Sequence, residues 1–114
     1  MLEAQDKKVK TSEVIRFVGG GALSEVTCQI LADITKRKVE TIENPQNAGA
    51  VGAALIAWLG LGLIESFKEI KKMVPAARTF LPDNQHREIY DHTFTIFKQL
   101  YKSNKKHFLK LNLK

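Results

Sequence analysis

Three consecutive glycines, Gly19 to Gly21, separate an apolar segment from a helical pattern near the start of the chain. Residues 14–18 are rich in β-branched and aromatic side chains, which predicts a strand, and Ser24 opens a run with helical spacing. Glycine lacks a Cβ, so this turn can adopt positive φ and leave its backbone open to a ligand. The unpaired N–H groups and the positive end of the following helix point to the same place. The order strand, glycine turn and capped helix therefore predicts a site that phosphates can approach.

The residues on either side of the turn predict a parallel βαβ unit. The first strand, 13–18, is apolar at nearly every position, which suits burial on both faces. Ser24 is a good N-cap for a helix that runs to about Thr35. A short strand is expected over 39–42, followed by a turn at 43–47, and two strands joined by one helix favour parallel pairing. The residues that recur at helical spacing through it are Leu23, Thr27, Ile30, Leu31 and Ile34.

The longest apolar run, Ala48 to Ile64, is shorter than the roughly 18 residues of a membrane-span candidate. We expect a buried helix over 48–59 and no membrane partner. A short helix over 67–73 and an extended segment over 78–81 follow. A last helix begins at 82–84, the tail 105–114 adds a further turn, and residues 2–9 form a helix end or a frayed lead-in. The inward stripe of the last helix is expected to be core: Ile89, Tyr90, Phe94, Phe97 and Tyr101.

Length and composition favour one cytoplasmic, soluble domain. The chain has 114 residues, 44% hydrophobic and 26% charged, which is ordinary for a globular protein. The charged N-terminus lacks the apolar core of a secretion signal. Cys28 is the single cysteine, so it forms no intrachain disulfide.

The formal net charge of +6 raises nucleic acid as an alternative partner. The basic residues gather in Lys36-Arg37-Lys38 and in the C-terminal lysines. However, lysines near helix C-termini also complement the helix dipole and solvate a surface. No aromatic-interleaved basic stripe accompanies them, so nucleic acid is the less favoured partner, testable by salt-dependent DNA retention.

Familiar catalytic and metal patterns are missing. The spacing of His86, His92 and His107 does not suit a shared metal site, and Cys28 has no histidine at helical spacing. The glycine run is followed by neither Gly-Lys-Ser/Thr nor the third glycine of a dinucleotide fingerprint, because position 24 is serine. Glu40 lies at about the ribose-binding distance of 20 residues, but without that glycine it gives weak support.

Several ordered motifs are more specific than the glycines alone: residues 15–22, 28–33, 39–40 and 47–54, continuing through 78–83 and the helix at 90–101. Together they resemble the C-terminal end of the FGGY family of carbohydrate kinases, most of all its xylulokinase branch. The resemblance covers the chain from about Val14 to Asn112. It implies a partial actin-like, ribonuclease-H-like α/β domain, with residues 1–114 as a single partial domain.

The resemblance also implies a role for the glycine turn. Members of this family transfer the γ-phosphoryl group of ATP to a sugar hydroxyl, here a pentulose-like sugar, with Mg²⁺. By that analogy Gly20, Gly21 and Ala22 approach the adenosine and α-phosphate, with Ser24 nearby at the helix start. The segment 48–54 packs behind the nucleotide as scaffold.

Other parts of the family's active site fall outside the resemblance. The catalytic aspartate, the sugar-binding residues and the first phosphate loop lie in the part that precedes this segment. Asp6, Asp33, Asp83 and Asp91 are not in matching contexts. We therefore expect a C-terminal fragment, from a split gene or an expressed piece, that is inactive alone without its N-terminal domain.

Two further expectations concern binding. Leu23 and Glu25 depart from the family pattern, and Glu25 places negative charge near the proposed phosphate, so weak or undetectable ATP binding is expected. A strand edge and a long apolar helix left uncovered favour a homo-oligomer. The alternative reading is a non-catalytic stand-alone module that binds or regulates a partner.

Overall fold

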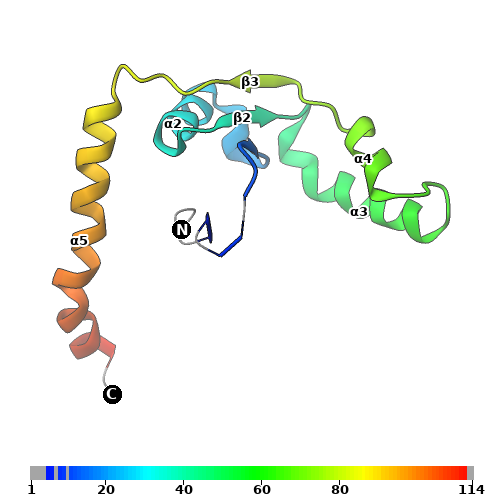
Figure 1. The fold of residues 1–114 in the computed structure, drawn as a ribbon. Helices are drawn as coiled ribbons and strands as arrows, with labels where there is room; N and C mark the ends of the chain where they lie inside the picture. The colour runs from blue at the N-terminus through cyan, green and yellow to red at the C-terminus, as the bar shows by residue number, and fades with distance from the viewer. Residues whose placement is uncertain (1–4, 7, 10, 113–114) are drawn as a thin grey trace. The chain divides into compact units, whose positions relative to one another are not determined.

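The protein is described by a computed structural model that covers residues 5–6, 8–9 and 11–112. It divides into two compact units, residues 1–82 and residues 83–114 (Figure 1). Of the lead-in expected over residues 2–9, residues 2–4 and 7 lie outside the described residues, and residues 5–6 are helical. Among those residues, no helix combines the length and the apolar character that crossing a membrane requires.

The first unit is built on a three-stranded mixed sheet in the order β1-β2-β3. β1 (Val14–Arg16) and β2 (Lys38–Thr41) are parallel, with Ile15 opposite Val39. Helix α2 (Glu25–Thr35) joins them, which confirms the predicted parallel βαβ unit. β3 (Arg78–Phe80) runs antiparallel to β2 beside it (Figure 1). The chain therefore has the α/β class that the sequence predicts.

The core lies between α2 and the sheet. Cys28, Ala32 and Val39 are fully buried, and Ile15 and Phe80 pack against them. Most of the residues at helical spacing lie away from this core, since Leu23, Ile30 and Ile34 are 41–54% exposed and Thr27 is exposed as well. A narrow sheet covers only one stripe of a helix, and here that stripe carries small side chains that allow close approach.

Strand β1 is shorter and less buried than expected. It spans three residues, Val14 and Ile15 are half-buried, and Val18 is exposed. Within the described residues β1 pairs with β2 alone, so its other edge is free. The expectation of burial on both faces was therefore wrong, because that burial needs a packed layer against each face and Arg16 and Val18 remain exposed.

Helices α3 (Ala48–Gly60) and α4 (Phe67–Met73) follow β2. The first of them lies where an apolar helix was predicted, but the prediction that it is buried was wrong. Leu55 is its buried residue, whereas Ile56 and Trp58 are 63% and 45% exposed. The first unit provides one surface for this helix, while its sequence is apolar all round.

The second unit holds α5 (Arg87–Asn112), a single helix of 26 residues. At its N-terminal end, Arg87 and Asp91, one turn apart, form an ion pair. The expectation that its aromatic stripe is core was wrong, because no residue of this helix is buried and Phe97 and Tyr101 are each 65% exposed. Residues 92–114 carry six lysines and no acidic residue, so they account for the whole formal charge of +6.

Candidate functional site at the glycine loop

The glycine loop begins with a left-handed residue. Gly19 has φ 91°, which confirms that the turn needs positive φ. Its N–H donates to the carbonyl of Pro45 at 2.7 Å, and Ala22 N–H donates back to the Gly19 carbonyl at 3.1 Å. Gly20–Leu23 then form a 3-10 turn, η1. These bonds give the loop a defined shape.

Gly20 and Gly21, the first two predicted site residues, differ in their surroundings. Both are exposed. A Cβ added to Gly20 would meet no atom within 4 Å, so open space lies beside this backbone. A Cβ added to Gly21 would stand 3.1 Å from Cζ of Phe17. Gly20 therefore leaves room for a ligand, whereas Gly21 makes room for the protein's own aromatic ring.

Ala22, the third predicted site residue, is fully buried. Its side chain is enclosed within the first unit. Its carbonyl accepts a weak hydrogen bond from Sγ of Cys28 at 3.6 Å. Burial raises the pKa of the Cys28 thiol, so the group is held neutral beneath the loop. Ala22 therefore anchors the loop and offers a ligand only its backbone.

Ser24, the fourth predicted site residue, caps helix α2 as expected. Its Oγ accepts a hydrogen bond from the Thr27 N–H at 3.3 Å, and its own N–H donates to the Gly21 carbonyl. The residue is exposed. The cap fixes the direction of the helix, whose positive end faces the loop.

Arg78 is the contact that sequence reasoning missed. It lies on β3, yet its Nη1 donates to Oε1 of Glu25 at 3.0 Å and its Nη2 donates to the Ala22 carbonyl at 3.4 Å. The two partners lie more than 50 residues before it in the chain. No local pattern signals this pairing, because it depends on β3 lying beside β2. Glu25 therefore carries a positive partner at the start of α2.

A second segment lies against the loop. Asn44 is left-handed with φ 47°, Pro45–Asn47 form a 3-10 turn, η2, and α3 starts at Ala48. The Gly19–Pro45 hydrogen bond joins this segment to the glycine turn. The start of the predicted scaffold segment 48–54 is thereby held close to the loop.

Glu40, which lies at about the ribose-binding distance in sequence, forms ion pairs on strand β2. It pairs with Lys38 at 2.8 Å and with Arg16 at 3.4 Å. The Lys38 ammonium, with Arg16 as a second partner, holds the pKa of the Glu40 carboxyl below its ordinary value. Arg16 also donates to the Val74 carbonyl at 2.7 Å, so it ties β1 to the end of α4. These contacts give both residues a structural role.

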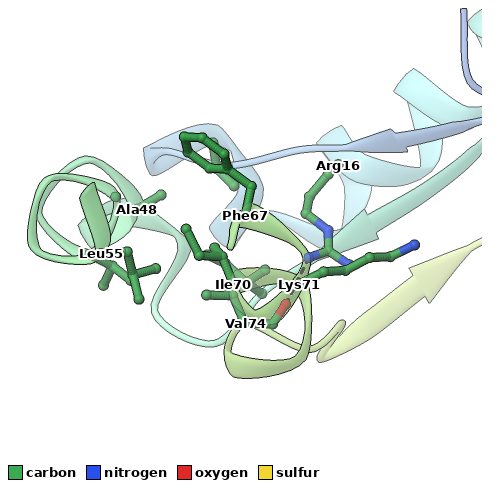
Figure 2. A pocket seen from close by; sticks show the side chains of 11 residues that line it. Arg16, Ala48, Leu55, Phe67, Ile70, Lys71 and Val74 are labelled. Atoms are coloured by element: carbon green, nitrogen blue, oxygen red, sulfur yellow. Dashed lines mark hydrogen bonds between the residues drawn. The ribbon is translucent and has the colours of Figure 1, made fainter. Parts of the chain in front are cut away.

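An apolar groove of about 360 Å³ lies between β1, α3 and α4. Figure 2 shows Ala48 and Leu55 from α3, Phe67, Ile70 and Lys71 from α4, and Arg16 from β1 around it. Its walls are mostly aliphatic, and Arg16 and Lys71 supply positive charge. Ala48 belongs both to this groove and to the helix start beside the glycine loop.

Metal ligands do not cluster in the part of the chain that the structure describes. No group of three or more histidine, cysteine or acidic side chains lies together there. Backbone N–H groups, a helix start and the Arg78 guanidinium meet at the loop, where the guanidinium binds the Glu25 carboxylate.

Comparison with known proteins identifies relatives of this chain. Residues 1–61 match the model of the C-terminal domain of the FGGY family of carbohydrate kinases. Autoinducer-2 kinases of Yersinia pestis (strain Pestoides F) and Yersinia pseudotuberculosis (serotype O:1b, strain IP 31758) are 34% identical over 99 residues. That match covers 86% of this chain and 18% of each relative.

Solved structures are similar as well. Xylulose kinase from Lactobacillus acidophilus superposes with a TM-score of 0.79 at 23% identity, over 93% of this chain and 21% of that one. Xylulose kinase from Rhodospirillum rubrum gives 0.74 at 28% identity, over 94% of this chain and 22% of that one. The chain thus spans about a fifth of the length of the relatives that it matches.

Proposed function

The chain belongs to the FGGY family of carbohydrate kinases and shares their actin-like fold, and on this premise we propose that it forms the nucleotide side of an ATP-dependent sugar kinase. The observation that carries the proposal is the open backbone at Gly20, next to a helix start that Ser24 caps. Gly20 and Gly21 supply main-chain N–H groups toward phosphate, Ala22 holds the loop on the core, and Ser24 orients the helix.

The residues present fit ATP better than they fit its metal. ATP supplies the phosphoryl group when it is bound, and Mg²⁺ neutralises its phosphates. The loop offers donors and open space for the nucleotide, whereas the described residues hold no carboxylate cluster for Mg²⁺. We propose that the metal arrives with the nucleotide and that its protein ligands lie in the preceding part of the kinase.

We further propose that the acceptor is a pentulose-like sugar, as in the xylulokinase branch, and that the enzyme works in the cytoplasm. Phosphoryl transfer requires donor, acceptor and metal to be positioned together, and one wall of a cleft does not achieve that. These 114 residues alone are therefore proposed to bind ATP weakly and to transfer no phosphate.

The exposed apolar surfaces support the proposal that this chain acts together with the rest of the kinase. The free edge of β1, the uncovered faces of α3 and the aromatic face of α5 are surfaces that another polypeptide buries in a stable assembly. We propose that the rest of the kinase covers them and that a second copy does so in its absence. The same exposure of α5 favours the second candidate function, a non-catalytic module that binds a partner.

A chimera tests the proposal. In it, this chain replaces the matching segment of the Yersinia pestis autoinducer-2 kinase, and ATP-dependent phosphorylation of that enzyme's sugar is measured. We expect transfer by the chimera and none by the 114 residues alone. Gly20→Ala should raise KM for ATP, because the methyl group occupies the open space, and Gly60→Ala, which also meets no atom within 4 Å, should not. A folded chimera without transfer would favour the non-catalytic module.

A further inference from the structure

Arg78 reaches the glycine loop from outside it. Its two terminal nitrogens contact the Ala22 carbonyl and the Glu25 carboxylate, at 3.4 and 3.0 Å. We propose that Arg78 is a positioning residue for the phosphates of the bound nucleotide, and that it exchanges Glu25 for a phosphate oxygen. This inference rests on the proposed function and adds a residue that selects for phosphate.

The location of the guanidinium is the first support. Ala22 follows Gly20 and Gly21 in the same 3-10 turn, so a group bound to the Ala22 carbonyl lies at the edge of the proposed site. The Arg78 side chain is 39% exposed and therefore accessible to a ligand. A guanidinium has five N–H donors in a planar fork, and such forks bind phosphate oxygens in pairs.

The present partner of Arg78 is the second support. The Glu25 side chain is 70% exposed, so its ion pair with Arg78 is solvated and contributes little stability. An incoming phosphate carries more negative charge than one carboxylate and accepts charge-assisted bonds at several oxygens. Exchange of partners therefore costs little, and the Glu25 carboxylate that is left unpaired keeps phosphate binding weak.

Two other arginines of the first unit have different tasks. Arg16 bonds Glu40 and the Val74 carbonyl, and Arg37 pairs with Asp6. Within the described part of the chain, the hydrogen bonds of these two arginines go to residues outside the loop, whereas Arg78 is bonded to it. The assignment of phosphate selectivity therefore falls on Arg78.

The test separates phosphate from nucleoside. Tripolyphosphate and adenosine are titrated separately into the isotope-labelled 114-residue chain, and the amide resonances of Gly20, Gly21 and Ser24 are followed by NMR. We expect Arg78→Gln to weaken tripolyphosphate binding about tenfold and to leave adenosine unchanged. Arg78→Lys should fall between, because an ammonium keeps the charge and loses the fork. Glu25→Gln should strengthen tripolyphosphate binding.

Three results would overturn the inference: no response of the loop amides to tripolyphosphate, equal tripolyphosphate affinity with and without Arg78, or equal weakening of adenosine and tripolyphosphate in Arg78→Gln. The last would mean that Arg78 only holds the loop in shape. Adenosine is the separate control for the proposed function. The unmodified chain could bind tripolyphosphate through Arg78 while its loop amides show no response to adenosine. In that case the nucleotide assignment fails and the phosphate role of Arg78 stands.

Discussion

The Cβ position of Gly21 faces the ring of Phe17, and a methyl group added there would stand 3.1 Å from its Cζ. Gly20, one residue earlier, faces open space. Adjacent glycines therefore have different physical reasons to be glycine, one in packing and one in access. Substitutions at Gly21 therefore test the stability of the loop, whereas substitutions at Gly20 test its binding of a ligand.

Gly21→Ala should destabilise the first unit by about 1 kcal/mol, the low end of overpacking costs. Phe17 packs against the buried cluster of Cys28, Ala32 and Val39, so its ring has little room to retreat. Gly20→Ala should be neutral or slightly stabilising, because it restricts the unfolded chain without a clash. Urea unfolding of the two variants measures the difference.

A double variant provides the control for this steric explanation. Phe17→Leu shortens the side chain opposite Gly21, so adding Gly21→Ala to it should cost less than adding Gly21→Ala to the natural sequence. Equal costs in both backgrounds would show that the ring is not the cause.

Ser24→Ala should cost about 1 kcal/mol of unfolding free energy, because the Thr27 N–H loses its acceptor. Ser66 is a matched control, since it occupies the N-cap of α4 without a side-chain cap bond. Ser66→Ala should change stability by much less. Thermal unfolding of the two variants measures the difference. Similar losses of stability in Ser24→Ala and Ser66→Ala would argue against a capping role for Ser24.

Glu40 should make stability fall in acid. Its pKa is lowered in the folded chain, so its ion pairs stabilise the fold fully above the unfolded value of about 4.3. That contribution is lost as pH falls through the lower folded value. The stability of Glu40→Gln should therefore depend less on pH below about 5 than that of the natural chain. Parallel pH curves of urea unfolding for the two proteins would contradict this.

Thr41→Val should stabilise the chain by about 1 kcal/mol. The Thr41 side chain is fully buried, and its Oγ1 lacks a hydrogen-bond partner among the described residues. Thr35→Val is the control, because Thr35 Oγ1 donates to the Leu31 carbonyl at 2.6 Å and its removal discards a bond. The two substitutions should shift Tm in opposite directions, and a lower Tm for Thr41→Val would indicate a water bound at Oγ1.

Local chemistry made the strand, glycine turn and helix predictable. The left-handed φ of Gly19 and the cap at Ser24 depend on residues within a few positions, and both are visible in sequence. The resemblance to the sugar kinases was likewise carried by short ordered motifs, and the family match confirms it.

Burial was less predictable, because it depends on surfaces that no local pattern specifies. Apolar residues such as Trp58 and Phe97 were expected inside and are exposed, since these 114 residues provide too few surfaces to cover them. The Arg78–Glu25 pair was missed for another reason. It arises from strand order, which brings together residues that are distant in sequence.

ATP titration of the isotope-labelled chain, followed by NMR, tests the central claim most directly. The account predicts weak, millimolar binding, with resonance changes centred on the amides of Gly20, Gly21 and Ser24 and reduced by Gly20→Ala. Gly60→Ala should leave the response unchanged. No localised change at millimolar ATP, or a change centred on the groove between α3 and α4, would contradict it.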